Sequence, residues 1–468
     1  MEYSRCYPDA PARIFFVGIG GIGMSGLAQL MAAKGYRVFG SDRGLDEPGK
    51  AELYSCLAQQ GISLFPQDGS GIAASCPDAL IVSTAVEDGN PDITAAKDIP
   101  ILHRAFALAQ TLKSCNIPLI AVAGSCGKTS VTGWVASALH TLGERVLVVN
   151  GGYYAGVPKP PYPGNFMMDE HPQWAVAEID ESDRSISEFS PEYGLLLNVG
   201  NDHYGEDELR QVFASFLSRC TKGAITSVAL RELVSGVKCP LGLFDTKPSD
   251  SSAVFPTDYS MDASVIRFNA NGIGIVRSGE SGHHSSHNAC AVLALLKMLG
   301  LKYTDEQLAA SIAAFPGIRQ RFEVMGKSAD GAALVNDYAH NPEKIAAAIS
   351  TAHERFGTPI VAFFQPHGFT PLGFMREKLL ETLAQNLRPG DAFCMLPVFY
   401  AGGTAAFKPT SEELIEELKQ KHLCPDGVSL FALPHNEAQK VIDAAPQKRA
   451  IIVMGARDSS LRPWTATL

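Results

Sequence analysis

The stretch IFFVGIGGIGMSG (14–26) decides how the first part of this chain folds. A short apolar run is followed by Gly18, Gly20 and Gly23 and then by a helical pattern, an order typical of a strand, a phosphate-binding turn and a helix. Asp42 ends the next apolar run, 42 − 23 = 19 residues after Gly23, where an acid can accept from a ribose hydroxyl. The stretch therefore predicts a Rossmann-like site for a nucleotide diphosphate. A tight packing turn is the alternative, and the pattern does not say which nucleotide binds.

The same alternation of apolar runs and helical patterns continues along the chain. Nearly continuous Val, Ile, Leu and Phe runs favour strands buried on both faces, as in parallel sheets, and the helical patterns between them make βαβ units. Such strands are predicted at 13–18, 36–41, 78–84, 117–124, 145–149, 174–179, 193–199, 332–338, 358–364, 391–396 and 449–455. Residues 245–286 are polar and rich in Gly and Ser, which indicates loops and short strands.

The length of 468 residues indicates two to four domains. Breaks in the pattern lie near 112–117 and 316–326. We therefore predict an α/β fold of three domains, with parallel or mixed sheets, over residues 1–114, 115–320 and 321–468.

Composition excludes several classes of protein. The 39 basic and 49 acidic residues give a net charge of −10 without a Lys/Arg run, which argues against a nucleic-acid partner. The ten cysteines form no CxxC pair, which disfavours a cysteine zinc site and fits a reducing cytoplasm. The N-terminus lacks the apolar core of a signal peptide, and no apolar stretch approaches the ~20 residues that span a bilayer. A cytoplasmic protein without membrane insertion is predicted.

A second glycine-rich loop, AVAGSCGKTSVTGW (121–134), is the sharper signal. It lacks the outermost Gly of a full P-loop, because Val122 stands there, but GxxGKT keeps the essential groups. Backbone N–H groups would wrap phosphate oxygens, Lys128 would place its charge on the β- and γ-phosphates, and Thr129 would reach Mg²⁺. Because the loop lies between a predicted strand and a predicted helix, an ATP site is expected.

Carboxylates follow the next apolar run of the same domain. The sequence EIDESD (178–183) supplies Glu178, Asp180, Glu181 and Asp183, and NVGNDHYG (198–205) supplies Asn198, Asp202 and His203 one strand later. Acidic clusters are usually solvated loops, and a lone His is usually structural. After buried strands of a P-loop domain, however, Mg²⁺ ligands are found at such positions.

In these motifs and their order, the chain resembles the Mur ligase family of ATP-dependent amide-forming enzymes. The resemblance runs through almost the whole chain. It rests on FVGIGGIGMSGLA (16–28), STAVEDGNPDI (83–93), GSCGKTS (124–130), EIDESD (178–183), NVGNDH (198–203), HN (287–288), GIRQRFE (317–323), DYAHNP (337–342) and FFQPHGFT (363–370). It implies a Rossmann-like domain that holds a UDP-sugar rather than NAD, a central ATP domain and a Rossmann-like C-terminal domain that binds the amine.

The resemblance also implies a role for each matching residue. The UDP-sugar would meet Gly18, Gly20, Gly21, Gly23, Asp42, Ser83 and Thr84. ATP would meet Gly124, Ser125, Cys126, Gly127, Lys128, Thr129, Ser130, Asn288, Arg321, Asp337 and His340. Mg²⁺ would be held by Thr129, Glu178 and His203, and Lys128, Glu178, His203 and Arg321 would be catalytic. The implied substrates are UDP-N-acetylmuramate and an amino acid, L-alanine favoured, in peptidoglycan precursor synthesis, with a monomer or homodimer as the assembly.

The chain departs from the family's alanine-adding pattern in places. Ser125 and Cys126 replace Thr and His, Ala291 replaces an Asn, and Asn341 replaces a His. Gly368 and Pro371 replace two arginines that help hold the amino acid. The ATP half is therefore better supported than the acceptor half.

Four alternatives stay open at this point. They are a recycling ligase for a murein tripeptide, a divergent ligase with another UDP-sugar or amine, a non-catalytic UDP-sugar- and ATP-binding module, and a nicotinamide oxidoreductase, which the P-loop disfavours. For the acceptor we predict contacts from His367 and from Arg376, the nearest downstream arginine, which would replace the missing clamp on the amino-acid carboxylate. A solvated helix residue is the alternative for Arg376.

Overall fold

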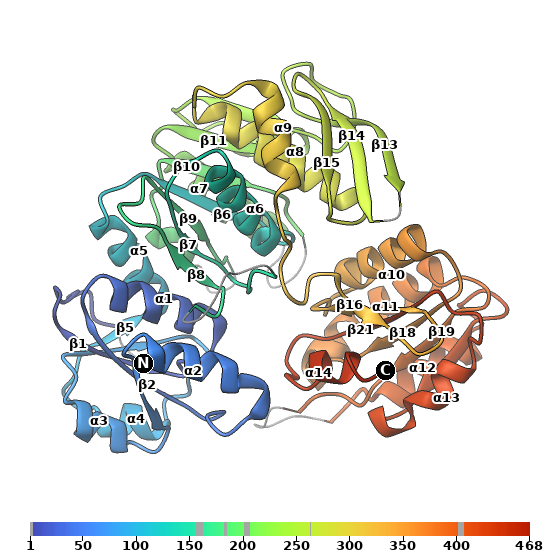
Figure 1. Ribbon diagram of the computed structural model, residues 1–468. Coiled ribbons are helices and arrows are strands. Elements are labelled where there is room, and N and C mark those ends of the chain that lie inside the picture. Colours follow the sequence, from blue (N-terminus) through green and yellow to red (C-terminus); the bar gives the residue numbers. More distant parts are fainter. Residues whose placement is uncertain (1–2, 156–161, 182–184, 201–205, 263, 401–406) are drawn as a thin grey trace. The chain divides into compact units, whose positions relative to one another are not determined.

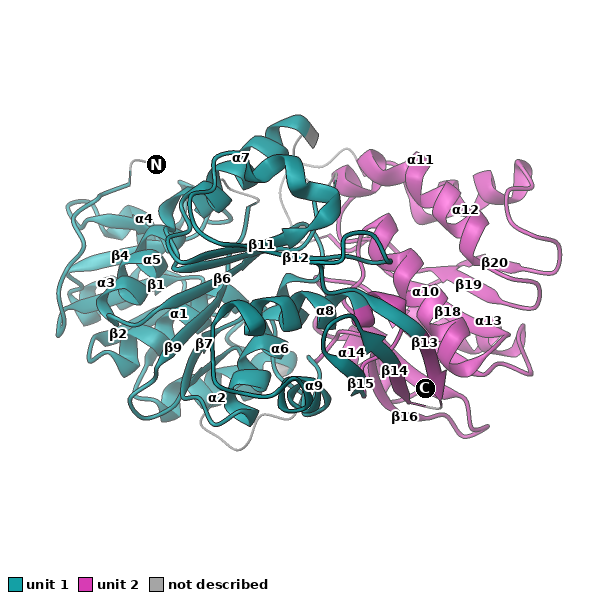
Figure 2. Cartoon of the chain, turned by 90° about the horizontal axis from the view of Figure 1, so that it is seen from above, with its two compact units in different colours: residues 1–258, 268–278, 287–318 teal, residues 259–267, 279–286, 319–468 magenta. Residues whose placement is uncertain are grey.

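The computed structural model describes residues 3–155, 162–181, 185–200, 206–262, 264–400 and 407–468. Helices and mostly parallel sheets alternate along the chain, as the sequence predicts (Figure 1). Two compact units are distinguished (Figure 2): unit 1 comprises residues 1–258, 268–278 and 287–318, and unit 2 comprises residues 259–267, 279–286 and 319–468. In the described part of the chain, no helix is long and apolar enough to cross a membrane.

Unit 1 begins with a five-stranded parallel sheet in the order β3-β2-β1-β4-β5. Its strands are β1 (Arg13–Val17), β2 (Arg37–Asp42), β3 (Ser63–Pro66), β4 (Ala79–Val82) and β5 (Ile101–His103), with helices α1 (Ile22–Ala33), α2 (Ala51–Gln59), α3 (Ser70–Ser75), α4 (Pro91–Ala95) and α5 (Arg104–Ser114). The strand order reverses between β1 and β4. Ligands of such sheets bind outside the carboxyl ends of the strands at this reversal.

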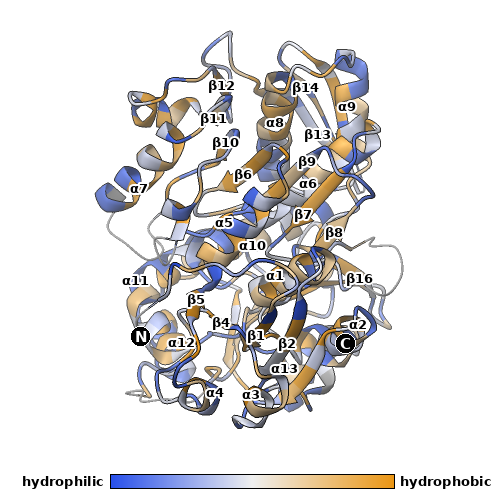
Figure 3. Cartoon of the chain, turned by 90° about the vertical axis from the view of Figure 1, so that its left-hand side faces the viewer, coloured by the Kyte–Doolittle hydropathy of each residue, from blue (hydrophilic) through white to orange (hydrophobic). Residues whose placement is uncertain are grey.

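A seven-stranded sheet follows in unit 1, in the order β12-β11-β10-β6-β9-β7-β8. Its strands are β6 (Leu119–Ala123), β7 (Val146–Val149), β8 (Phe166–Met168), β9 (Trp174–Glu178), β10 (Tyr193–Leu196), β11 (Gly223–Ser227) and β12 (Leu241–Phe244), and only β8 pairs antiparallel. The helices of this part of the chain are α6 (Lys128–Thr141), α7 (Glu206–Ser218), α8 (His283–Met298) and α9 (Asp305–Ala313). The central strand β6 is apolar (Figure 3), in keeping with burial on both faces.

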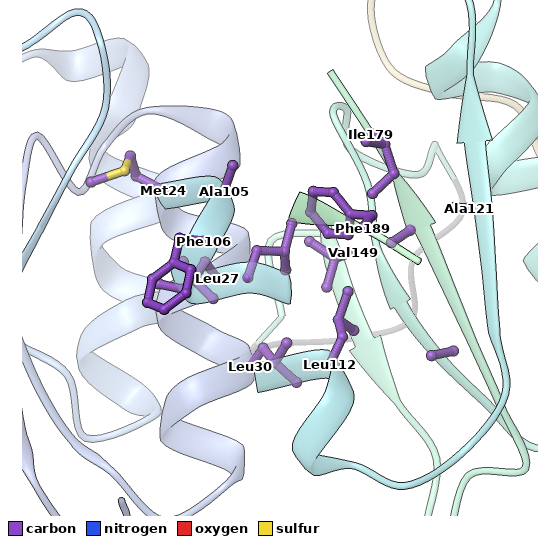
Figure 4. Close-up of a cluster of buried hydrophobic side chains, with 14 of the residues drawn as sticks. Met24, Leu27, Leu30, Ala105, Phe106, Leu112, Ala121, Val149, Ile179 and Phe189 are labelled. Carbon is purple, nitrogen blue, oxygen red and sulfur yellow. The ribbon is translucent and has the colours of Figure 1, made fainter. Parts of the chain in front are cut away.

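The two sheets of unit 1 share one hydrophobic core. Leu30 of α1 and Leu112 of α5 belong to the same buried cluster as Val149 of β7 and Phe189 (Figure 4). A buried amide adds polar contacts at this junction: Asn165 Nδ2 donates to Ile22 O at 2.7 Å and to Ser25 Oγ at 2.8 Å, and Gln29 Nε2 donates to Asn165 Oδ1 at 3.0 Å. Helix α1, which begins at the first glycine loop, is thereby fixed to the sheet that carries the second.

Unit 2 is built on a six-stranded sheet in the order β16-β17-β21-β18-β19-β20. The strands are β16 (Glu323–Lys327), β17 (Ala333–Asp337), β18 (Ile360–Phe364), β19 (Ala392–Met395), β20 (Ser429–Ala432) and β21 (Ala450–Met454), with helices α10 (Pro342–Phe356), α11 (Phe369–Asn386), α12 (Ser411–Gln420), α13 (Ala438–Asp443) and α14 (Leu461–Thr465). Only β16 pairs antiparallel. Local signals set the helix starts, as where Asn341 caps α10 ahead of Pro342.

Each predicted strand appears in the structure, shortened by one to three residues at some ends. A three-stranded sheet, β13 (Pro256–Asp262), β14 (Val265–Ala270) and β15 (Gly274–Ser278), lies in the stretch where only loops and short strands were expected. The predicted domain limits at 114/115 and 320/321 stay predictions.

Candidate active site

The second glycine-rich loop lies between β6 and α6, at the carboxyl edge of the seven-stranded sheet. Gly124 and Gly127 have backbone φ angles of +137° and +85°, which residues other than glycine rarely adopt. Gly127 is the N-cap of the 14-residue helix α6, so the first backbone N–H groups of α6 have no intrahelical acceptors. Free N–H groups and the positive end of the helix dipole together favour a phosphate here.

Asn198, which follows β10, holds this loop in shape. Cys126 N donates to Asn198 Oδ1 at 2.8 Å, and Asn198 Nδ2 donates to Cys126 O at 2.9 Å. Gly200 N donates to Ser125 Oγ at 2.8 Å. The sequence placed Asn198 at a ligand-collecting edge, and the structure shows that its amide braces the phosphate loop.

Lys128, the first residue of α6, is surrounded by carboxylates. Its Nζ donates to Gly124 O at 2.6 Å and to Glu181 Oε2 at 2.8 Å. Burial alone would lower the pKa of Lys128, but the charges of Glu181, Glu178 and Asp180 outweigh it and raise that pKa. The side chain of Lys128 is 13% exposed, so this cation stays charged in a largely dehydrated place.

The hydroxyl of Thr129 and the carboxylate of Glu178, both predicted ligands of a divalent cation, meet beside the loop. Thr129 Oγ1 donates to Glu178 Oε1 at 3.2 Å, and Gly151 N donates to Glu178 Oε2 at 2.9 Å. The register Val122↔Glu178 between β6 and β9 brings these groups to one edge. Hydroxyl and carboxylate oxygens are ligands that Mg²⁺ prefers, so the pair fits this ion. The predicted ligand His203, with Asp183 and Asp202, lies outside the described residues.

Asn288 of α8 lies beside the loop. A Cβ at Gly127 would be 3.3 Å from Asn288 Oδ1. The structure therefore places the residue predicted to meet adenine next to the P-loop, although the two are 161 residues apart (288 − 127).

The first glycine-rich loop joins β1 to α1. Asp42 Oδ2 accepts from Gly20 N at 2.8 Å, and Asp42 Oδ1 accepts from Gly44 N at 2.8 Å. Asp42 thus braces the loop in the structure, whereas its predicted partner is a ribose hydroxyl. Ser83 and Thr84 follow β4, the neighbour of β1 across the strand-order reversal.

Sequence reasoning missed one cation at this edge. Arg104 begins α5, and its Nη1 would be 2.7 Å from a Cβ at Gly23. The short strand β5 before it gave no clear pattern, so the position of Arg104 at the carboxyl edge was not recognised. A side chain at position 23 would require this guanidinium to shift.

The residues predicted in the C-terminal part cluster at the carboxyl edge of the unit 2 sheet. Asp337 ends β17 and accepts from Phe322 N and Ala339 N, both at 2.6 Å. Burial raises the pKa of Asp337, and the charges of Arg321 and Lys344 oppose this only in part. The guanidinium of Arg321 lies 4.9 Å from the ring centre of Tyr338.

His340 is kept neutral in this cluster. Burial lowers the pKa of His340 to about 3, and Lys344 and His367 add to the effect. Because Tyr338 O can only accept, His340 Nδ1, 3.0 Å away, carries the proton and donates. The Nε2 atom of His340 therefore keeps its lone pair. The rings of His340 and His367 are 5.1 Å apart, which brings a predicted nucleotide residue and a predicted acceptor residue together.

Arg376 is already engaged. Its Nε and Nη2 donate to Glu417 Oε2 at 2.9 and 2.6 Å, and Lys421 also contacts Glu417. Arg376 lies seven residues into α11, after the loop that contains His367 (376 − 369). Its role as the carboxylate clamp stays a prediction, which would require exchange of this partner.

Two family models and several curated proteins are similar to this chain. Residues 13–114 match the Mur ligase family, catalytic domain, and residues 320–457 match the Mur ligase, glutamate ligase domain. The UDP-N-acetylmuramate–L-alanine ligase of Streptomyces avermitilis is 30% identical over 433 residues, which cover 87% of this chain and 87% of that protein. The chain belongs to the Mur ligase family. A protein of the same name from Rhizobium etli is 28% identical over 485 residues, or 98% of this Mur ligase and 97% of its relative.

Solved structures agree with this assignment. The crystal structure of the UDP-N-acetylmuramate–alanine ligase MurC from Thermotoga maritima superposes on this Mur ligase with a TM-score of 0.77 and 27% identity, covering 97% of this chain and 99% of that one. A murein peptide ligase from Psychrobacter arcticus, at 20% identity and a TM-score of 0.67, shows the same fold. The predicted family resemblance and α/β fold class are confirmed.

Proposed function

We propose that this Mur ligase joins the carboxylate of UDP-N-acetylmuramate to an amino acid, L-alanine favoured, at the expense of ATP. The observation that carries the proposal is the strand–GxxGKT–helix edge, where Lys128 donates to Glu181 and Thr129 donates to Glu178. The similarity to proteins named UDP-N-acetylmuramate–L-alanine ligase over most of the chain supports the choice of substrates. The reaction belongs to peptidoglycan precursor synthesis in the cytoplasm.

The chemistry needs an activated acyl group. A substrate carboxylate oxygen attacks the γ-phosphorus of ATP, the bond to the β–γ bridging oxygen breaks, and an acyl phosphate and ADP form. The amine then attacks the acyl carbon, inorganic phosphate leaves, and the ammonium proton is released. Lys128 lies where it would neutralise charge on the transferred phosphoryl group, exchanging its contact with Glu181 for phosphate oxygens.

Thr129 and Glu178 are proposed to hold Mg²⁺, with His203 as a further ligand. When bound, Mg²⁺ would screen the negative charge of the phosphates. The proposal is supported by the contact between Thr129 Oγ1 and Glu178 Oε1, which are 3.2 Å apart.

The UDP-sugar is proposed to bind at the first loop, where Gly18, Gly20, Gly21, Gly23, Asp42, Ser83 and Thr84 gather at one sheet edge. The polar contacts of Asn165 support a fixed spacing between that loop and the ATP loop, because α1 cannot move without breaking them. The three domains predicted from the sequence then divide the work among UDP-sugar, ATP and amine, with Arg321, Asp337 and His340 completing the nucleotide site and His367 and Arg376 contacting the amine. A monomer or homodimer is proposed.

A phosphate-release assay tests the proposal. Purified protein with ATP, Mg²⁺ and UDP-N-acetylmuramate should release phosphate only when an amine is added, and the amine panel should include each amino acid and the murein tripeptide. If the tripeptide is the only amine that supports phosphate release, the recycling ligase is favoured. This alternative is kept because Gly368 and Pro371 replace the arginines of the family pattern. Release that needs neither the UDP-sugar nor an amine would refute the proposal.

A binding measurement tests the first loop separately. UDP-N-acetylmuramate should bind without ATP in calorimetry, and NADH should not bind. Gly20→Ala should weaken the binding of the UDP-sugar, because the Cβ of the new alanine would collide with Tyr54 and Asp42. Tight NADH binding would show that this loop serves a dinucleotide.

A further inference from the structure

The inference concerns the acceptor's carboxylate and rests on the proposed function. An amino acid bound away from bulk water needs a cation for its carboxylate, because an unpaired buried charge is costly. Arginine suits this role best, since its fork can form two parallel hydrogen bonds. Among the arginines of unit 2, Arg376 is occupied by Glu417, and Arg462 donates to both carboxylate oxygens of Glu323 at 2.9 and 2.6 Å. Another arginine therefore has to be considered.

Arg457 follows the carboxyl edge of the unit 2 sheet, where the predicted site residues of this unit cluster. It follows β21 by three residues, and β21 lies between β17 and β18 in the strand order. The registers Asp337↔Met454 and Phe364↔Met454 align the carboxyl ends of the three strands. The loop that contains Arg457 therefore starts between the strand end at Asp337 and the strand end that leads to His367.

Backbone contacts tie these three loops together at their bases. Gly455 N donates to Asp337 O at 3.1 Å, and Gln365 N donates to Met454 O at 2.9 Å. A Cβ at Gly455 would be 3.4 Å from Gln365 Cβ. Gly455 is thus packed against Gln365. Arg457 follows Gly455 by two residues, and His367 follows Gln365 by two residues.

The side chain of Arg457 is available for a ligand. It is exposed, and in the described part of the chain it forms no hydrogen bond or ion pair. The adjacent acid does not hold it, because Asp458 Oδ1 accepts from Ser460 N at 2.9 Å and from Ser460 Oγ at 2.5 Å. An arginine left open at the carboxyl edge contrasts with the glutamate-bound Arg376 and Arg462.

We propose that Arg457, together with His367, binds the carboxylate of the amino-acid acceptor and so replaces the arginines that Gly368 and Pro371 cannot supply. Arg457 is then the residue that makes the enzyme select an amino acid over an amine without a carboxylate.

The test compares L-alanine with L-alaninamide as acceptors in the phosphate-release assay. The wild-type protein should use L-alanine with the lower KM. Arg457→Ala should raise the KM for L-alanine about ten- to hundred-fold, the loss expected for one charge-assisted hydrogen bond, while the KM for L-alaninamide changes little. The KM for ATP and for UDP-N-acetylmuramate should stay within a small factor. Arg457→Lys should recover only part of the preference, since an ammonium lacks the planar fork.

Arg388→Ala is the matched control, because Arg388 is an exposed arginine of the same unit that precedes β19, at the opposite edge of the sheet. It should behave as wild type. If Arg457→Ala keeps the wild-type preference for L-alanine over the amide, the inference is wrong. If Arg376→Ala alone removes the preference, the clamp is Arg376. If the wild-type protein releases no phosphate with any amine of the panel, the proposed function itself fails, which is a different result.

Discussion

The carboxyl edges of the two larger sheets surround their buried cationic and titratable groups with different partners. At the edge of unit 1, Lys128 and Glu181 are paired at 2.8 Å. Carboxylates raise the pKa of Lys128, whereas burial raises the pKa of Glu181 in spite of Lys128. At the edge of unit 2, burial drives groups toward their neutral forms, raising the pKa of Asp337 and lowering that of His340 to about 3. Both edges follow parallel strands, so topology does not cause the difference.

The difference follows from the partners that each edge contains. Unit 1 places a carboxylate within hydrogen-bond distance of Lys128, so this cation is stabilised before any ligand arrives. Unit 2 provides backbone N–H groups for Asp337 and a carbonyl for His340, which compensate less for lost hydration. The edge of unit 1, where phosphate and metal are proposed to bind, thus has a charged lysine already in place, whereas the edge of unit 2, where the amine is proposed to bind, keeps a neutral imidazole.

The largest expected effect comes from removing the cation of the charged edge. Lys128→Ala should lower kcat about 100- to 1000-fold, the usual cost of losing one group that stabilises charge in the transition state. Binding of UDP-N-acetylmuramate, measured by calorimetry, should be nearly unchanged. Lys302→Ala, which alters an exposed lysine of the same unit, is the control. Near-normal phosphate release by Lys128→Ala would show that the P-loop assignment is wrong.

Removing the partner of Lys128 should affect stability instead. Breaking a buried ion pair typically costs ~3–5 kcal/mol, but Glu178 and Asp180 still face Lys128 in Glu181→Gln, so we expect about 2 kcal/mol. Urea unfolding of the nucleotide-free protein measures this loss. Added ATP and Mg²⁺ should restore part of it, because phosphate oxygens can take the place of Glu181. An unchanged urea midpoint would mean that the pair contributes nothing net.

Altering the proposed metal ligand Glu178 tests the same edge with a smaller expected effect. Glu178→Gln keeps the size of the side chain and removes its charge, so the Mg²⁺ concentration for half-maximal activity should rise, by roughly tenfold if one charge-assisted contact of ~1.5 kcal/mol is lost. A titration of phosphate release against Mg²⁺ gives this value. An unchanged Mg²⁺ requirement would shift the ligand role to Asp180, Glu181 or Asp183.

The smallest effect is expected at the neutral edge. The pKa of His340 is about 3 in the folded protein and ~6.5 when unfolded, so the unfolded chain takes up the extra proton first. The stability contributed by this neutral imidazole is fully present above pH 6.5 and is lost as pH falls toward 3. In His340→Asn, the fall in urea midpoint from pH 7 to pH 5 should therefore be smaller than in wild type. An equal fall in both proteins would argue against the neutral state.

Sequence patterns predicted the parts of the fold that local physics determines. Long apolar runs marked the inner strands such as β6 and β18, because strands buried on both faces need apolar side chains throughout. Among the strands that went unnoticed, β3 and β5 are short and only partly buried, and their residues carry little periodic signal. The sheet β13–β15 alternates buried and exposed residues within a polar stretch, which hides it from a search for apolar runs.

The candidate site was predicted unevenly for a similar reason. Lys128, Thr129 and Glu178 lie within or directly after motifs, so their convergence at one edge followed from strand order. The brace formed by Asn198 on Cys126 and the position of Arg104 at Gly23 depend on contacts between distant segments. No spacing rule encodes such contacts. The pairing of Arg376 with Glu417, 41 residues away, was hidden from the sequence for the same reason.

The core shared by the two sheets of unit 1 has a consequence for how the protein is made. When the first 114 residues have left the ribosome, the faces of α1 and α5 that bury Leu30 and Leu112 still lack their partners on β7 and at Phe189. Roughly 75 more residues (189 − 114) must be synthesised before that cover is complete, which at ~5–20 residues per second takes about 4–15 s. During this interval the nascent chain presents an apolar surface next to a nearly finished five-stranded sheet. Chaperone binding during synthesis should therefore concentrate on this window, and a fragment that stops at residue 114 should aggregate when expressed alone.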